Sequence, residues 1–187
     1  MKISNKIILT IAFIAAIVAG LFFFTSCENR SSGKGHESEV HGMVISISDG
    51  DTYDILVNGN KKIRIRMYGI DAPEKGMPFY KVSKKCLGSL CFKKNVRIEI
   101  TDTDKYGRTV ARTYLDDGRE LGLEMIKAGY AWHFKKYSSD ADLTEAEITA
   151  RNNKLGLWAD PRPIPPWEIR KLHREGISTK DSFKITN

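Results

Sequence analysis

The sequence contains few of the side chains that bind soft metal ions: three cysteines and four histidines among 187 residues. No CxxC motif and no cysteine–histidine spacing typical of a zinc site is present. Two of the cysteines, Cys86 and Cys91, fall in one segment predicted to be helical, where their spacing points them to different faces. This spacing disfavours a disulfide bond between them and favours small, buried apolar side chains.

Proline is scarce before the C-terminal part of the chain, since four of the six prolines lie between residues 161 and 166. A segment so rich in proline is predicted to run extended along the domain surface. Residues 159–187 are therefore interpreted as a proline-rich and polar tail. No internal repeat is evident, and the length and the 41% hydrophobic content suit one globular domain.

Acidic residues are outnumbered: 23 Asp and Glu stand against 30 Lys and Arg, and the pI is about 9.3. The basic residues recur throughout the chain. Such an excess favours a polyanionic partner, above all a nucleic acid, through long-range attraction and counterion release. Charge that serves only solubility is the alternative explanation.

One long hydrophobic run begins the chain. Lysines occur within residues 1–6, residues 7–24 are almost entirely apolar, and two small residues then precede Cys27. The pattern resembles a bacterial lipoprotein signal, in which Cys27 becomes the lipidated first residue of the mature chain. An uncleaved membrane anchor is the alternative, because residues 7–24 approach the length that spans a bilayer. Either way, we expect a cell-envelope protein whose body lies outside the cytoplasmic membrane, beyond a polar tether at residues 28–39.

Hydrophobic periodicity predicts five short β-strands, with one helix after the third strand and two more near the end of the domain. The strands are expected at residues 41–48, 52–57, 62–68, 96–100 and 109–115, and the helices at 78–92, 120–127 and 142–154. The dipeptide Asn58-Gly59 predicts a tight hairpin between the second and third strands. This order favours an α+β fold that is mainly β, a five-stranded barrel of the oligonucleotide-binding (OB) type.

Four clusters of charged residues follow one another: Asp49-Gly50-Asp51-Thr52, Arg66, Asp71-Ala72-Pro73-Glu74 and Asp104-Lys105-Tyr106-Gly107-Arg108. Each cluster alone could be a polar turn or surface charge. Together they supply carboxylates, which bind hard divalent cations, and guanidinium groups, which bind phosphate through two-point contacts. A further carboxylate can activate water. The set therefore favours metal-assisted cleavage of a phosphodiester.

The ordered motifs DGDT, IRMYGIDAPE and DKYGR, followed by Gly156-Leu157-Trp158, resemble those of the staphylococcal-nuclease-like (thermonuclease) family. The resemblance extends over a domain at residues 40–158. It implies an OB-fold barrel with about three helices, and an endonuclease that needs Ca²⁺ and hydrolyses DNA and RNA to 3′-phosphate products. We also expect a monomer.

The resemblance implies roles for individual residues. The calcium ligands would be the carboxylates of Asp51 and Asp71 and the backbone carbonyl of Ala72, at a position where the best-known member has threonine. Three side chains match the family's catalytic residues: Arg66, Glu74 and Arg108. Three others match residues that contact the phosphate or stack on a base of the substrate: Lys105, Tyr106 and Tyr137.

A non-catalytic OB-type module, binding nucleic acid or protein at the cell envelope, is the alternative function. A pure binder would not need all five charged residues of the implied site, so their joint presence favours the enzyme. His133 could shuttle protons, but its position between Trp132 and Phe134 favours a packing residue. We expect packing roles for Trp132, Trp158 and Trp167 as well.

Overall fold

The structure is a computed structural model that describes residues 39–179 and residue 181. These residues belong to one compact unit, which runs from Glu37 to Asn187. The predicted signal segment and nearly all of the predicted tether lie outside the described residues. Within the part of the chain that the structure describes, no helix is both long and apolar enough to cross a membrane.

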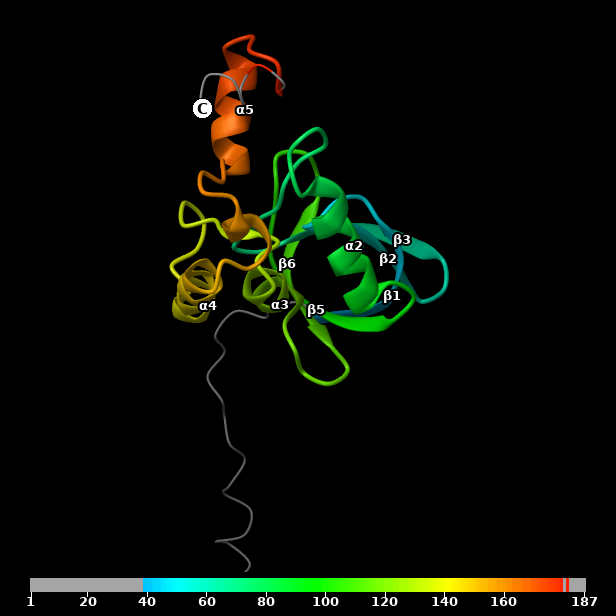
Figure 1. The fold of residues 1–187 in the computed structure, drawn as a ribbon. Helices are drawn as coiled ribbons and strands as arrows, with labels where there is room; N and C mark the ends of the chain where they lie inside the picture. The colour runs from blue at the N-terminus through cyan, green and yellow to red at the C-terminus, as the bar shows by residue number, and fades with distance from the viewer. Residues whose placement is uncertain (1–38, 180, 182–187) are drawn as a thin grey trace, which may run out of the picture. The chain divides into compact units, whose positions relative to one another are not determined.

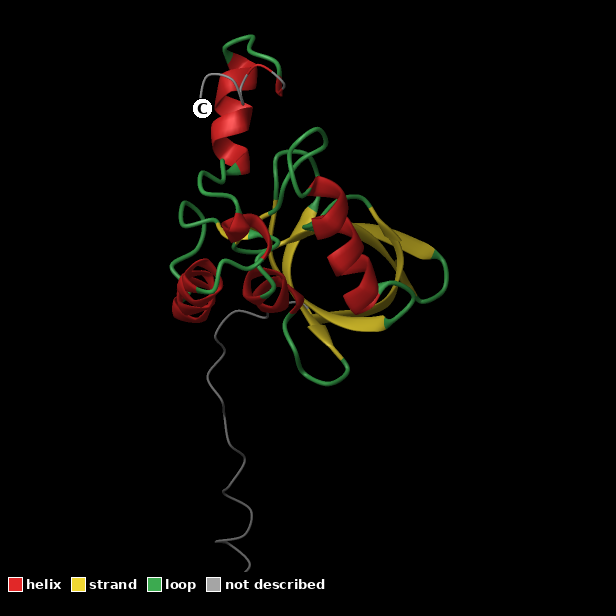
Figure 2. Cartoon of the chain, viewed as in Figure 1, coloured by secondary structure: helices red, strands yellow, loops and turns green. Residues whose placement is uncertain are grey.

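Five strands close into a barrel in the order β1-β2-β3-β6-β5 (Figures 1 and 2). They are β1 (Glu39–Ile47), β2 (Thr52–Val57), β3 (Lys61–Met67), β5 (Asn95–Thr103) and β6 (Thr109–Leu115). Neighbouring strands are antiparallel except β3 and β6, which pair in parallel and complete the closure. The predicted five-stranded barrel is confirmed, and its strands match the predicted ranges to within a few residues.

The hairpin between β2 and β3 turns at the predicted dipeptide. Asn58 and Gly59 both have positive φ angles, 50° and 74°. The N–H of Asn60 donates to the carbonyl of Val57 across the turn at 3.2 Å. Asparagine and glycine tolerate this left-handed backbone, whose twist matches that of the flanking strands.

Helix α2 (Tyr80–Cys91) lies at one end of the barrel in Figure 2 and buries Leu87 and Cys91 in the core. Both Cys86 and Cys91 are free thiols. The Cys91 thiol donates to the carbonyl of Leu87 at 3.2 Å, and burial raises its pKa to about 12. Cys91 is therefore an inert packing residue.

The remaining elements pack beside the barrel: α3 (Leu121–Lys127), α4 (Ala141–Asn152), the 3₁₀ turn η1 (Gly156–Ala159), and a two-stranded sheet of β4 (Ile70–Asp71) and β7 (Trp132–His133). Trp132 and Trp158 are buried against each other edge to face, with ring centroids 5.5 Å apart. The third tryptophan, Trp167, packs against this second hydrophobic cluster. All three tryptophans thus pack as predicted.

The C-terminal tail differs from its prediction. It was expected to run extended, but α5 spans Pro166–Arg174 and makes a fourth α-helix in the described residues. A proline at the first position of a helix loses no hydrogen bond there, and its fixed φ suits the helix. The residues before Pro166 are not helical, so the proline pair ends the extended segment and begins a helix. Ile169, fully buried, anchors α5.

Candidate active site

The turn between β1 and β2 carries the first acidic cluster. The N–H of Asp51 donates to the carboxylate of Asp49 at 3.0 Å, and the hydroxyl of Thr52 donates to Oδ1 of Asp51 at 2.9 Å. Asp51 is only 5% exposed. Burial, and then the neighbouring Asp51 carboxylate, raise the pKa of Asp49.

Gly50 allows this turn to approach the rest of the site. A Cβ atom at Gly50 would lie 1.9 Å from Oγ of Ser83 on α2 and 2.8 Å from Cβ of Ala72. Any side chain would therefore push the acidic turn away from α2 and from the second cluster. Glycine in the DGDT motif keeps Asp51 next to the segment that contains Asp71 and Ala72.

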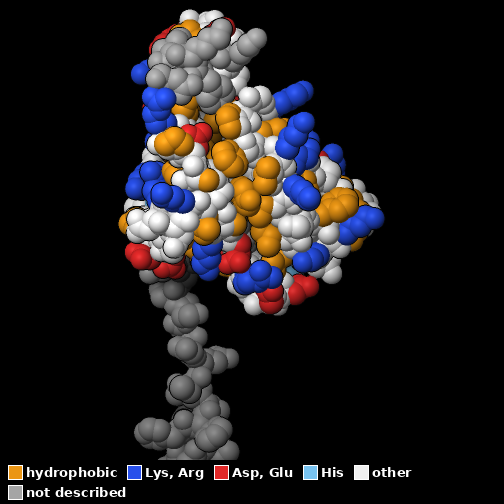
Figure 3. All heavy atoms as spheres, in the orientation of Figure 1, with side chains coloured by type: hydrophobic (Ala, Val, Ile, Leu, Met, Phe, Trp, Pro, Cys, Tyr) orange, Lys and Arg blue, Asp and Glu red, His pale blue; other side chains and the backbone are white. Residues whose placement is uncertain are grey.

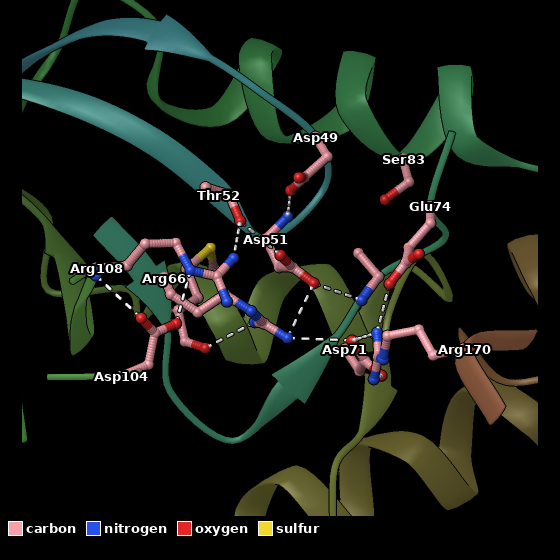
Figure 4. A network of polar contacts seen from close by, with 12 residues as sticks. Asp49, Asp51, Thr52, Arg66, Asp71, Glu74, Ser83, Asp104, Arg108 and Arg170 are labelled. Carbon is pink, nitrogen blue, oxygen red and sulfur yellow. Dashed lines mark hydrogen bonds and ion pairs between the residues drawn. The ribbon is translucent and has the colours of Figure 1, made fainter. Parts of the chain in front are cut away.

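The second acidic cluster begins in β4 and faces the first one (Figure 4). The N–H of Ala72 donates to Oδ2 of Asp51 at 2.7 Å. Asp71 and Ala72 are both almost fully buried. The contact joins two motifs that are 21 residues apart in the sequence.

Arg66 lies between the two buried aspartates. It projects from β3, where it pairs with Thr52 of β2. Its Nη2 is 3.1 Å from Oδ1 of Asp71 and 3.3 Å from Oδ2 of Asp51, and its side chain is only 13% exposed. The structure thus brings together Asp51, Arg66 and Asp71, whose association the sequence motifs implied.

Arg108, at the start of β6, is oriented by Asp104. Its Nε donates to Oδ2 of Asp104 at 2.7 Å, and its Nη1 reaches the hydroxyl of Thr52 at 3.5 Å. Oδ1 of Asp104 accepts the backbone N–H groups of Tyr106 and Arg108. Burial raises the pKa of Asp104, but the hydrogen bonds from Arg108 and Tyr106 outweigh it and hold the pKa below its usual value. Asp104 had no assigned role in the sequence analysis, although it lies in the DKYGR motif.

Glu74 and Asp71 share a third arginine, Arg170 of α5. Its Nη1 is 2.6 Å from Oε1 of Glu74, and its Nη2 is 2.6 Å from Oδ2 of Asp71. Burial raises the pKa of Asp71, and the hydrogen bonds from Arg170 oppose that rise. The sequence analysis missed Arg170 because it treated the tail as extended. The proline pair immediately before Trp167 was the available signal for a helix start.

A single cleft of about 1800 Å³ is lined by all of these charged groups. It is also lined by Lys105, Tyr106 and Tyr137, the residues that the resemblance implies for substrate binding. Tyr106 is 73% exposed and Tyr137 is 62% exposed, so both rings have faces available for stacking. Figure 3 shows basic side chains spread over the face in view rather than gathered in one patch.

The oxygen donors of the cleft fit a hard cation. Asp51 and Asp71 approach the same nitrogen of Arg66, so the two carboxylates lie close together. Among the described residues, no three His, Cys, Asp or Glu side chains form a group that could hold a metal ion. Ca²⁺ takes six to eight oxygen ligands, including backbone carbonyls and water. Two carboxylates and the carbonyl of Ala72 are therefore compatible with Ca²⁺ when water and substrate oxygens complete the shell.

His133 lines the same cleft but is only 2% exposed. Its Nδ1 is 3.1 Å from the hydroxyl of Thr144, and its backbone N–H donates to Glu147. Burial lowers the pKa of its imidazole, which favours the neutral form. These contacts are those of a packed residue.

Proteins with similar sequences bear the names of nucleases. Residues 64–160 match the family model described as "Staphylococcal nuclease homologue". A Haemophilus influenzae protein named "Uncharacterized endonuclease" is 44% identical over 131 residues, which cover 70% of this chain and 73% of that protein. The "Micrococcal nuclease" of Shigella flexneri is 37% identical over 151 residues, 75% of this chain and 86% of that protein. "Protein ParB" of Escherichia coli is 33% identical over 144 residues, with 72% and 81% covered.

Proposed function

The chain belongs to the family of staphylococcal nuclease homologues, and we propose that it is a calcium-dependent endonuclease that hydrolyses DNA and RNA to 3′-phosphate products. One observation carries this proposal above the others. Asp51 and Asp71 meet at Arg66, and the cleft that they line also contains Glu74 and Arg108. A non-catalytic binding module would have no use for two buried carboxylates held this closely together.

Three groups would hold the cation: the carboxylates of Asp51 and Asp71 and the backbone carbonyl of Ala72. When bound, Ca²⁺ would polarise a phosphoryl oxygen and neutralise part of the charge that develops on it. The aspartates are held for this task by protein contacts, since the N–H of Ala72 donates to Asp51 and Arg66 contacts both carboxylates.

Arg66 and Arg108 are the proposed phosphate-binding arginines. Each is fixed by a carboxylate, Arg66 by Asp71 and Arg108 by Asp104, so each guanidinium is oriented before substrate arrives. Donors oriented in advance stabilise the negative charge of the five-coordinate transition state without reorganising during the reaction. The planar guanidinium also contacts two phosphate oxygens at once.

Glu74 is the proposed group that orients the attacking water or accepts its proton. Its side chain is 39% exposed, which leaves it accessible to water in the cleft. The water oxygen forms a bond to phosphorus as the bond to the 5′-oxygen breaks. The phosphate then stays on the 3′-oxygen, and the leaving 5′-oxygen takes up a proton.

Substrate binding is assigned to Lys105, Tyr106 and Tyr137. A lysine pairs with phosphate, and an exposed tyrosine ring stacks on any base. Such contacts do not read base edges, which supports a substrate range that includes both DNA and RNA.

The localisation proposal rests on the first residues of the sequence. We propose that the chain is a monomeric envelope lipoprotein, attached through Cys27, with its nuclease domain outside the cytoplasmic membrane. The supporting pattern is the basic start, the apolar run and the small residues before Cys27.

The nuclease proposal is tested with the full chain purified in mild detergent. It should fragment single-stranded DNA and RNA in the presence of Ca²⁺, and a chelator should stop the reaction. The fragments should accept a 5′-phosphate from a kinase without prior treatment and carry a phosphatase-sensitive 3′ end. If both polymers bind but stay intact with Ca²⁺, the protein is a non-catalytic binding module.

A further inference from the structure

Helix α5 lies beyond the residues that the family model matches, yet one of its faces lines the cleft. Four of its side chains line the same cavity as Arg66 and Glu74: Trp167, Arg170, Lys171 and Arg174. Their spacing is that of a single helical face, one residue or pair per turn. Three of the four are basic.

The opposite side of α5 holds this basic face in place. Pro166 and Ile169 are buried, Ile169 completely. On the cleft side, the Trp167 ring stacks on Phe134, with centroids 5.1 Å apart and planes only 3° from parallel. The guanidinium of Arg170 lies 5.8 Å from the centre of the same Phe134 ring. These contacts turn the basic face toward the cleft.

The three basic residues differ in how their charge is compensated. Arg170 is paired with Asp71 and Glu74, which are both proposed to act in the reaction. Lys171 and Arg174 are exposed, and neither has an acidic partner among the described residues. The cleft thus has two uncompensated positive charges on α5, one helical turn from the proposed reacting groups.

We propose that α5 is a nucleic-acid-binding element of this site. Its basic face binds the phosphates of a polynucleotide strand, with Arg170 nearest the phosphate that reacts. This proposal rests on the proposed nuclease function, and it extends the substrate site beyond the matched family domain to a helix that follows it.

Two observations favour a strand over a mononucleotide. The cleft, at about 1800 Å³, exceeds the roughly 300–1,000 Å³ of a small-molecule site. Arg170 and Arg174 are one turn apart, about 6 Å along the helix, which is comparable with the separation of neighbouring phosphates. Phosphate offers a guanidinium the same two-point contact as a carboxylate, so Arg170 can exchange Asp71 for a phosphate.

The test measures binding without cleavage. A labelled single-stranded oligothymidylate is titrated with the full chain in chelator, and fluorescence anisotropy is recorded at several salt concentrations. The double variant Lys171→Ala/Arg174→Ala should bind more weakly. Its dependence of log K on log salt should be shallower by roughly 1.4, because each lost phosphate contact on a single strand changes this slope by about 0.7.

The matched control is Lys81→Ala/Lys85→Ala on α2. It removes the same charge from two exposed positions on a helix, and neither position lines the cleft. Affinity should change little in this control, and the salt slope should equal that of wild type. The α5 positions are equally exposed, so both variants should keep the wild-type thermal midpoint.

A second measurement uses the reaction itself. With Ca²⁺, the α5 double variant should show a higher KM and an unchanged kcat, because Lys171 and Arg174 bind the strand away from the reacting phosphate. If the double variant matches the α2 control in affinity, slope and KM while wild type cleaves, the role of α5 is refuted and the nuclease proposal stands. If wild type binds the oligonucleotide but never cleaves it, the nuclease proposal fails and the salt-slope result alone decides the role of α5.

Discussion

Arginine carries the polar contacts of this site at the scale of single residues. Arg66, Arg108 and Arg170 each pair with a carboxylate of the cleft, and each retains donors that a phosphate could accept. A guanidinium suits this dual use because its donors form a rigid fork and its charge persists at any physiological pH. The three arginines should therefore differ in what their loss changes.

Replacing Arg66 with lysine should lower turnover with little effect on the fold. Loss of one oriented donor to a developing charge typically reduces kcat about 10²–10³-fold, and lysine cannot supply two contacts in one plane. Arg64→Lys is the matched control, since Arg64 lies two residues away on the same strand but pairs with Asp54 outside the cleft. Steady-state cleavage rates decide the matter, and equal rates in both variants would refute the proposed role of Arg66.

Replacing Arg170 with alanine should strengthen calcium binding in the absence of nucleic acid. Arg170 engages both oxygens of Asp71, so it competes with a cation for the same carboxylate. A charged hydrogen bond contributes about 1.5–3 kcal/mol, which makes an affinity gain of about tenfold reasonable. Calorimetric titration measures it, with Arg174→Ala as the control that leaves Asp71 paired. Weaker binding by Arg170→Ala would show that Arg170 supports the ligand and does not compete with the cation.

Secondary-structure elements are held to one another by a few buried carboxylates. Asp54 on β2 accepts from Arg64 and Ser46 and pairs with Lys62, which joins three strands of the barrel. Asp140 caps α4 and pairs with Arg112 of β6, which in turn pairs with Glu120 at the start of α3. Both aspartates lie away from the proposed reaction, so their effects should be on stability.

Asp54 should make the stability of the barrel depend on pH in acid. Hydrogen bonding from Arg64 lowers the pKa of Asp54 to about 2, below the unfolded value near 3.9. The stabilisation is therefore complete above about pH 4 and is lost as pH falls through about 2. Arg64 and Lys62 are more than half exposed, so screening by solvent should limit the contribution to about 1–2 kcal/mol.

Urea unfolding of Asp54→Asn at several pH values measures this contribution. The difference in free energy of unfolding from wild type should be largest at neutral pH and should shrink toward pH 2. Asp117→Asn is the control, because Asp117 pairs with Arg119 at a solvent-exposed turn and should matter less. A difference that is constant with pH would contradict the assigned pairing.

Asp140→Ala should destabilise the domain by about 2 kcal/mol, because it removes an N-cap and a partner of Arg112. The Asp140 carboxylate accepts the N–H groups of Asp142 and Leu143. Asp142→Ala removes the same charge one turn into the helix at an exposed position, and its loss should stay below about 1 kcal/mol. Chemical denaturation compares the two, and equal losses would mean that the cap contributes nothing of its own.

At the scale of the whole molecule, the described residues form one compact unit to which the family site and the C-terminal helix both belong. The attachment of this unit to a membrane is proposed from residues 1–27 alone. Its test therefore concerns the processing of the chain rather than its fold.

Cys27→Ala should abolish lipid attachment and change processing of the precursor. Lipidation requires the cysteine thiol, so the variant should fail to incorporate labelled fatty acid and should migrate differently from wild type. Replacing Cys86 with alanine is the control, since that thiol lies within the folded unit. If mature wild type retains residues 1–26, the uncleaved anchor is the correct interpretation.

Local patterns in the sequence determined the barrel and most of the proposed site. The alternation of apolar residues marked each strand, the Asn58-Gly59 pair marked the hairpin, and Gly129 marked the end of α3. These features depend on neighbours within a few residues, where backbone geometry relates sequence directly to structure. The motifs around Asp51, Arg66 and Asp71 followed from family resemblance, and their distances did not.

Tertiary structure alone decided which groups meet in the cleft. Arg170 reaches Asp71 across 99 residues, and no spacing within the sequence encodes that contact. It arises because burial of Ile169 and stacking of Trp167 on Phe134 dock α5 beside the barrel. The pairing of Arg66 with both aspartates likewise required the barrel to close and Gly50 to admit the acidic turn. Long-range contacts of this kind depend on the packing of the complete domain, which a local pattern does not contain.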